Sequence, residues 1–289
     1  MFKPWIAPAR WSFAVILIAQ FVVIFSSTAG ETAAENRRWS NQRSCSCIAI
    51  DPMTKDLYTL LQADHSSKIL KTSPSGVTTV IASGLGDPEG IAVDPHTKDV
   101  YTTDQYRGGY GGAILKTTAK GKTTVVAEGA QLGRISGIAI DPDTKDVYTT
   151  DSGFGKNAGR VLKTASNGST TVVASNGVGN AYGIALDIKT KDLYTTDYHG
   201  RILKISLDGS ITVIASGELG NPFYIAVDPN SKNLYTTPGV RGKVLKTSPE
   251  GSSTEVTASK FPSSTGIAID PSANSLYMTD GEKILRIPL

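Results

Sequence analysis

This sequence of 289 residues is poor in the residues on which several protein classes depend. Its two cysteines are too few for a scaffold held by several disulfides or for a four-cysteine zinc module. Lys and Arg number 29 against 26 Asp and Glu, so the chain lacks the strongly basic balance of a nucleic-acid-binding domain. It also has no phosphate-binding loop and no HExxH metal motif. Hydrophobic residues still make up 39%, which is enough to build a core.

The sequence has a single long apolar run, FAVILIAQFVVIF at residues 13–25. Lys3 and Arg10 precede it, and the small residues SSTAG follow it at 26–30. This order is typical of a secretory signal peptide. A helix of that length spans about 20 Å, less than the roughly 30 Å hydrocarbon core, which favours a cleaved signal over an anchor. We expect a signal peptide at 1–30 and a secreted or periplasmic domain at 31–289, with no membrane span after signal removal.

After residue 30 the chain consists of six repeats of one sequence unit. The string Gly-Ile-Ala-(Val/Ile)-Asp-Pro recurs with small changes, and a tyrosine stands seven positions after each aspartate. Successive aspartates are 41 to 47 residues apart. The units start near residues 47, 90, 137, 183, 224 and 266, and their aspartates are Asp51, Asp94, Asp141, Asp187, Asp228 and Asp270.

Each unit contains four short β-prone runs, seen clearly in the third unit at 137–141, 147–151, 160–164 and 170–175. Four strands in a repeat of this length predict a blade of a β-propeller, and no sustained helical period competes with that interpretation. We therefore expect an all-β fold, a six-bladed propeller with four antiparallel strands per blade. The sixth unit ends after three strands, so we expect the N-terminal segment at 36–44 to complete the last blade.

The turn after the first strand of each unit reads Asp-Pro-x-Thr-Lys-Asp with small changes. Asp opens a turn with its side chain and Pro presets the following φ, so the repeated aspartate has a structural explanation. We expect the lysines of this turn, and those that end the third strands, to be solvated surface charges. The turn lysines are Lys55, Lys98, Lys145, Lys191 and Lys232.

The strings Glu89-Gly-Ile-Ala-Val-Asp94 and Tyr101-Thr-Thr-Asp104 resemble the repeats of NHL and YWTD six-bladed propellers, and the resemblance extends over residues 47–289. The second position of the YWTD motif is Thr here, not Trp, and Trp5, Trp11 and Trp39 all lie outside the repeats. Similar proteins include regucalcin-type and gluconolactonase-type hydrolases, virginiamycin B lyase-like enzymes, strictosidine synthase-like proteins and binding modules. The motif thus indicates a fold and leaves the function open.

A propeller binds its ligands at the channel mouth and on the rim made by the loops before the first strand and between the second and third strands. These loops differ most between the units, and they carry aromatic and basic residues. We expect a binding module for a small molecule, a glycan or a peptide, with no nucleic-acid partner. The candidate ligand-binding residues are Tyr106, Arg107, Tyr110, Arg134, Tyr182, Tyr198, Arg201, Phe223, Tyr224 and Arg241.

The resemblance also implies an alternative, a metal-dependent small-molecule hydrolase or lyase with a divalent cation, Ca or Mg, in the channel. Glu89 would then be a metal ligand or acid, and His65 or His199 the general base. Asn180 and Asn221 are further candidate ligands. One acid with two amides is a small set for a cation that takes about six oxygens, so the binding module ranks first.

Cys45 and Cys47 stand where the ring begins, and Cys47 occupies a position that is Gly in most units. A disulfide across one residue is strained, which favours a bridge to a partner or two buried thiols. A closed ring has no free sheet edge that would force dimerisation, so we expect a monomer.

Overall fold

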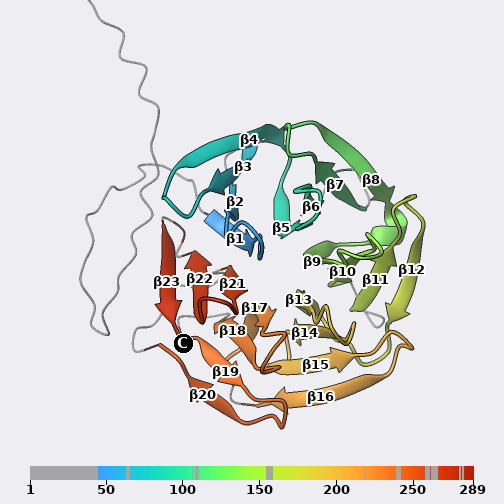
Figure 1. Ribbon diagram of the computed structural model, residues 1–289. Coiled ribbons are helices and arrows are strands. Elements are labelled where there is room, and N and C mark those ends of the chain that lie inside the picture. Colours follow the sequence, from blue (N-terminus) through green and yellow to red (C-terminus); the bar gives the residue numbers. More distant parts are fainter. Residues whose placement is uncertain are drawn as a thin grey trace, which may run out of the picture.

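The computed structural model describes residues 45–289, except 63–65, 106, 108–110, 154–158, 218, 239–241, 258–260, 262–265, 280 and 282. Its strands form six antiparallel sheets arranged around a central axis (Figure 1). Five sheets have four strands and the sixth has three. The described residues contain one short helical element, the 3-10 helix η1 (Ala130–Leu132). The expected all-β, six-bladed propeller is confirmed.

The strands follow one another from the centre of each blade outward. Blades one to three contain β1 (Cys45–Ile50), β2 (Leu57–Leu61), β3 (Ser67–Thr72), β4 (Thr78–Leu85), β5 (Pro88–Val93), β6 (Val100–Asp104), β7 (Gly112–Thr117), β8 (Thr123–Gly129), β9 (Ile135–Ile140), β10 (Val147–Asp151), β11 (Arg160–Thr164) and β12 (Thr170–Ala174). Blades four to six contain β13 (Ala181–Leu186), β14 (Leu193–Asp197), β15 (Arg201–Ile205), β16 (Ile211–Ser216), β17 (Pro222–Val227), β18 (Leu234–Pro238), β19 (Leu245–Thr247), β20 (Ser253–Glu255), β21 (Ile267–Asp270), β22 (Ser275–Thr279) and β23 (Ile284–Pro288).

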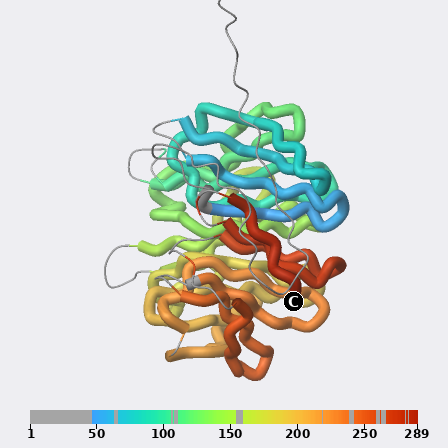
Figure 2. Tube along the Cα trace, turned by 90° about the vertical axis from the view of Figure 1, so that its left-hand side faces the viewer, coloured from blue at the N-terminus to red at the C-terminus, as the bar shows by residue number. Residues whose placement is uncertain are grey.

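The innermost strands close the ring. Each of β1, β5, β9, β13 and β17 contacts the innermost strand of the next blade, and β21 contacts β1. The last blade therefore lies against the first one, as the side view also shows (Figure 2). Because successive strands are antiparallel, the turns between strands one and two and between strands three and four share one rim, which we call the lower rim. The upper rim carries the loops between strands two and three and the connections to the next blade.

The sixth blade has three strands among the described residues, β21 to β23. The segment at 36–44, expected to supply a fourth strand, lies outside the described residues, as does the expected signal peptide at 1–30. Within the described part of the chain, no helix is long and apolar enough to cross a membrane.

The hydrophobic core lies between neighbouring blades. Leu60 and Ile69 of blade one pack in one cluster with Ile91, Val93 and Leu115 of blade two. All residues of the second strands of blades one to four are buried, whereas most residues of the outer strands β4, β8, β12 and β16 are exposed or half-buried. Sheets that are covered on both faces need apolar side chains on both, which explains why the inner runs are apolar rather than alternating.

The lower rim contains an arrangement that corrects one expectation. The turn lysines are not solvated charges, because each forms an ion pair with the buried aspartate of the preceding blade. Lys98 Nζ lies 2.6 Å from Asp51 Oδ2, and Lys55 Nζ lies 2.9 Å from Asp270 Oδ1 across the closure of the ring. The other pairs are Lys145–Asp94, Lys191–Asp141 and Lys232–Asp187.

The local backbone helps to explain these pairs. All five lysines have positive φ, between 62° and 66°, where non-glycine residues are uncommon, and in this turn the side chain reaches the neighbouring blade. The lysines that end the third strands are also paired, with the aspartate at the start of strand two in their own blade. The pairs are Lys71–Asp56, Lys116–Asp99, Lys163–Asp146 and Lys204–Asp192.

Candidate functional site

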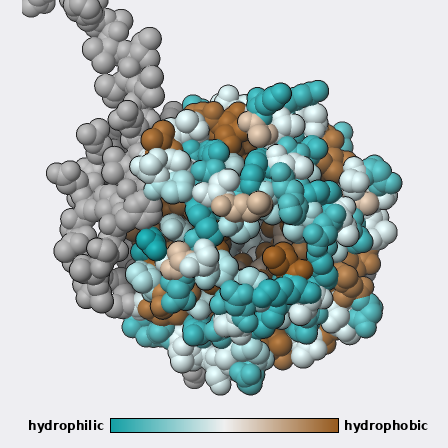
Figure 3. Space-filling view, viewed as in Figure 1, coloured by the Kyte–Doolittle hydropathy of each residue, from teal (hydrophilic) through white to brown (hydrophobic). Residues whose placement is uncertain are grey.

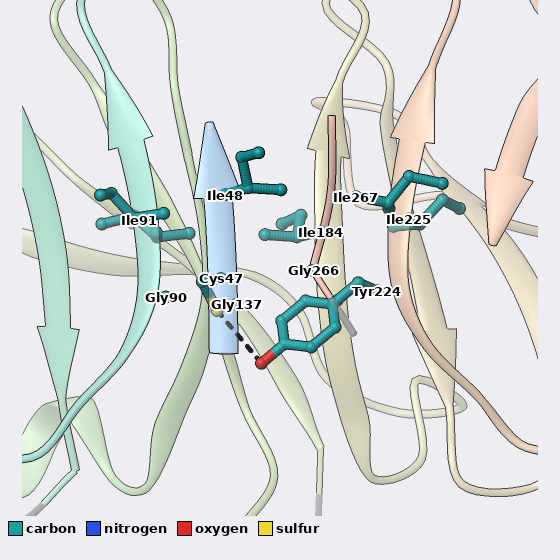
Figure 4. A pocket seen from close by; sticks show the side chains of 12 residues that line it. Cys47, Ile48, Gly90, Ile91, Gly137, Ile184, Tyr224, Ile225, Gly266 and Ile267 are labelled. Atoms are coloured by element: carbon teal, nitrogen blue, oxygen red, sulfur yellow. Dashed lines mark hydrogen bonds between the residues drawn. The ribbon is translucent and has the colours of Figure 1, made fainter. Parts of the chain in front are cut away.

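The centre of the ring encloses a narrow channel, with a cavity of about 60 Å³ lined by the first strands (Figure 4). Each blade contributes an isoleucine, and in four blades a glycine precedes it. The cavity has room for water molecules, whereas pockets for drug-sized ligands measure roughly 300–1,000 Å³. A ligand of that size must therefore contact the mouth of the channel and not its interior.

The glycines are needed because neighbouring blades approach closely. A Cβ at Gly137 would lie 2.3 Å from the backbone oxygen of Tyr182 in the next blade. A threonine in strand two links the same positions. Thr150 Oγ1 accepts a hydrogen bond from Gly137 N at 2.9 Å and donates to Tyr182 O at 2.6 Å. Thr103 and Thr196 make the same two contacts in blades two and four.

Blades one and five depart from this arrangement, with Cys47 and Tyr224 at the glycine position. Leu60 stands where the other blades have the linking threonine, and the thiol of Cys47 takes over its contact: Sγ donates to the backbone oxygen of Glu89 at 2.5 Å. Cys47 Sγ is also hydrogen-bonded with Tyr224 Oη at 3.1 Å (Figure 4). The side chain of Tyr224 thus extends past Gly266 of blade six, and its hydrogen bond with Cys47 links blade five to blade one.

These two side chains lie in the wall of the channel. Burial of the Tyr224 hydroxyl raises its pKa well above 10, and the nearby Cys47 and Glu89 raise it further. Tyr224 therefore remains a protonated phenol at neutral pH. Cys47 is 3% exposed. The side chain of Cys45 lies outside the described residues.

Above the isoleucines, three positions at the start of the first strands form the mouth of the channel: Glu89, Tyr182 and Phe223. Each stands two residues before a channel-lining isoleucine, next to an irregularity in the pairing of the first and second strands, and each is partly exposed. The rings of Tyr182 and Phe223 come from adjacent blades, with centroids 4.5 Å apart and planes inclined by 41°. Phe223 and Tyr224 have centroids 6.5 Å apart. The space-filling view shows a hollow near the centre of the ring with hydrophobic atoms beside it (Figure 3).

Glu89 belongs to blade two and Phe223 to blade five, so they stand on opposite sides of the ring. Burial raises the pKa of the Glu89 carboxyl and the charge of Asp87 raises it further, while Arg134 acts in the opposite direction. The guanidinium of Arg134 is held by Gln105, whose Oε1 accepts from Nε at 2.8 Å. The mouth therefore combines aromatic faces on one side with an acidic group on the other.

The remaining predicted residues are dispersed. Arg201 is bound within its own blade, because Nε donates to the buried Asp197 carboxylate at 2.7 Å and Nη2 to Gly177 O at 3.0 Å. Arg107, Tyr198 and His199 are exposed on the upper rim. The predicted residues His65, Tyr106, Tyr110 and Arg241 lie outside the described residues.

The three residues proposed as metal ligands belong to different blades: Glu89 lies on β5, Asn180 directly before β13 and Asn221 directly before β17. Asn180 is partly exposed, and Asn221 is exposed in a turn with φ 53°. Among the residues that the structure describes, no three His, Cys, Asp or Glu side chains come together as a site for a metal ion. Glu89 and the exposed Asp87 are fewer oxygen donors than the six to eight that Ca²⁺ takes.

Sequence reasoning missed three features of this region: the buried Gln105 that holds Arg134, the linking threonines, and the Cys47–Tyr224 contact. The last had a signal in the sequence, since residues 47 and 224 are the two places where the repeated glycine is replaced. The partners themselves are 177 residues apart, and nothing local in the sequence pairs them.

No protein-family model and no curated protein matches this sequence. The structure is similar to a chain in the crystal structure of a nidogen/laminin complex, with 23% identity and TM-score 0.61 over 71% of this chain and 75% of that one. It is also similar to a gluconolactonase from Xanthomonas campestris, with 16% identity and TM-score 0.66 over 86% of both chains. Virginiamycin B lyase from Staphylococcus aureus has 17% identity and TM-score 0.59, over 85% of this chain and 84% of that one.

These similar structures include a protein from a protein–protein complex and two enzymes. At such identities they establish the fold, the six-bladed propeller, and leave the activity open.

Proposed function

We propose that this chain is an exported binding module whose ligand contacts the mouth of the channel on the upper rim. The apolar run at 13–25 supports export. The ligand is a small molecule, or part of a glycan or a peptide, that meets the rings of Tyr182 and Phe223 together with Glu89. The chain acts as a monomer, since contacts between the innermost strands of neighbouring blades close the ring within one chain.

The observation that carries this proposal is the group of three aromatic rings, Tyr182, Phe223 and Tyr224, at one side of the mouth. Tyr182 and Phe223 come from adjacent blades, and their ring centroids are 4.5 Å apart. Both side chains are partly exposed. Exposed aromatic side chains that are held rigidly supply large contact areas at low entropic cost, as binding surfaces require. The lower rim shows no such group among its described residues.

A second candidate function is a small-molecule hydrolase or lyase with Glu89 as an acid. The raised pKa of the Glu89 carboxyl, caused first by its burial, favours it, since a general acid needs a carboxyl that holds its proton to a higher pH than usual. His199, exposed on the same rim, would be the base. The small oxygen ligand set described above weighs against the metal-dependent form of this candidate.

Binding assays with the purified protein separate the two candidates. A panel of small polar molecules, oligosaccharides and peptides is screened by thermal shift and calorimetry, and hits are repeated with Tyr182→Ala, Phe223→Ala and, as control, Leu207→Ala. Leu207 is 52% exposed in a lower-rim turn. We expect the two mouth variants to lose binding about tenfold or more and the control to bind normally. A ligand affinity that is unchanged in both Tyr182→Ala and Phe223→Ala would contradict the proposal.

Turnover assays test the enzyme. Lactone hydrolysis or lyase activity that disappears in Glu89→Gln, together with about one divalent ion per chain lost on chelation, would replace the binding module by the second candidate.

A further inference from the structure

Among the described residues of the upper rim, Asp151 and Asp197 form ion pairs with arginines of their own blades, and Glu89 forms none. Asp151 accepts from Arg160 Nε at 2.9 Å, and Asp197 accepts from Arg201. Within the described part of the chain, the Glu89 carboxylate makes no hydrogen bond and no ion pair, although its backbone oxygen accepts from Cys47. The charge of Arg134 acts on Glu89 without an ion pair, and a half-buried carboxylate is stabilised further where a ligand brings an opposite charge into direct contact.

The charge around this carboxylate favours a cation over an anion. Glu89 and Asp87 are two acidic groups near the mouth, and Arg134 is the basic group that acts on Glu89. Arg134 is already oriented by Gln105, and Arg160 and Arg201 are neutralised by buried aspartates. Of the four arginines that the sequence predicts for this rim, Arg134 and Arg201 are held by other side chains, Arg107 is exposed, and Arg241 lies outside the described residues. Next to Glu89 the described charges are thus Asp87 and the Arg134 that Gln105 holds.

The aromatic rings favour an organic cation over a metal ion. The faces of aromatic rings attract ammonium groups, most strongly where water is excluded. Tyr182 and Phe223 present such rings, and the Tyr224 hydroxyl is held beneath them by Cys47. A metal ion would instead need several oxygen ligands, and the described residues of the mouth offer few.

We propose that the mouth binds a small organic cation, an amine or quaternary ammonium compound, between the Glu89 carboxylate and the rings of Tyr182 and Phe223. This inference rests on the proposed function and names its ligand class. The ammonium group lies at the mouth because the cavity below it measures only about 60 Å³. The rest of the ligand extends over the upper rim.

A matched pair of probes tests the charge directly. Choline and 3,3-dimethyl-1-butanol have the same shape, with nitrogen in one and carbon in the other. Both are titrated by calorimetry into wild-type protein, Glu89→Gln and the control Glu128→Gln, whose exposed carboxylate lies on β8. We expect choline to bind wild type and Glu128→Gln about tenfold more tightly than the alcohol, and Glu89→Gln to remove this difference.

Several outcomes overturn the inference. Equal binding of the two probes shows an apolar site, and choline binding that persists in Glu89→Gln shows that the carboxylate is not the counter-charge. Absence of choline binding at millimolar concentration, or its displacement by equimolar Ca²⁺, also contradicts the organic cation. If a neutral ligand then binds in a manner that depends on Tyr182 and Phe223, the binding module stands and its ligand class is wrong. If no ligand depends on these rings, both fail.

Discussion

The two rims of the propeller are built by the same six repeats, yet they use their charged residues differently. On the lower rim, five turn lysines each reach a buried aspartate of the preceding blade. On the upper rim, charges pair inside single blades, as in Asp197–Arg201, and Glu89 is left without a partner in the described part of the chain. The lower rim thus holds neighbouring blades together, whereas the mouth of the upper rim leaves polar and aromatic groups partly exposed.

The lower rim also contains its own exception. In blade six, Asn274 stands at the lysine position with φ 45°, and it bonds to the backbone of Leu289. Asp228 of blade five consequently keeps its turn hydrogen bonds from Asn230 N and Ser231 Oγ but has no lysine from the next blade. The chain therefore provides a natural control for the ion pairs, one turn of the same type without the lysine.

Low pH is expected to have the largest effect on stability, because it protonates the aspartates of all five lower-rim ion pairs at once. Burial by itself raises the pKa of each paired aspartate, but hydrogen bonds from lysine and from the turn outweigh it, so each pKa lies below the ordinary 3.8. A depressed folded-state pKa gives stability that is present above the unfolded pKa and lost as pH falls through the folded one. We expect the pairs' stabilisation to hold from pH 7 to about 5 and to fall below about 4, measured by thermal unfolding. A melting temperature that stays constant down to pH 2 would contradict the ring of ion pairs.

A single pair gives the next largest effect. Asp187 is fully buried and lies 2.5 Å from Lys232 Nζ. Asp187→Asn keeps the side-chain oxygen that accepts from Lys189 N but removes the charge, and we expect a loss of about 2–4 kcal/mol in the free energy of unfolding. Asp228→Asn is the matched control, with an expected loss of about 1 kcal/mol or less. Urea titrations with equal m-values measure both, and equal losses would show that the lysines contribute nothing.

The Cys47–Tyr224 contact lies between the two rims and has an intermediate effect. Cys47→Ala removes the donor to Glu89 O and leaves the Tyr224 hydroxyl without this partner, so we expect a loss of about 1–3 kcal/mol. Cys47→Ser, which keeps a donor, should recover part of it. In a double-mutant cycle with Tyr224→Phe we expect a coupling of about 1 kcal/mol, and strict additivity would show that the two side chains do not interact.

The mouth residues give the smallest effect on stability. Tyr182 and Phe223 are partly exposed, so we expect Tyr182→Ala and Phe223→Ala to change the free energy of unfolding by about 1 kcal/mol or less while they weaken ligand binding. Chemical denaturation measures the first quantity and calorimetry the second. A large loss of stability without a change in binding would make these rings a structural plug of the channel and would remove the distinction between the rims.

Much of the fold follows from local patterns. The repeat of Gly-Ile-Ala and Tyr-Thr-Thr strings with their turns predicts six blades because each string encodes a strand or turn by its own composition. The same register places Glu89, Tyr182 and Phe223 at the start of first strands, and the structure confirms this position for all three. The sequence did not predict the role of Arg201. Its partner Asp197 is only four residues away, but the sequence pattern around Arg201 is equally compatible with an exposed ligand-binding arginine on the rim.

By itself the sequence determined the blades, their number, and the positions that surround the channel, since these depend on residues close together along the chain. Only the tertiary structure decided which side chains remain available. Lys191 and Asp141 are 50 residues apart, and Cys47 and Tyr224 are 177 apart. Such pairs form only when blades pack side by side around a closed ring, which brings opposite charges within reach at the lower rim. At the upper rim it leaves Glu89, Tyr182 and Phe223 partly exposed.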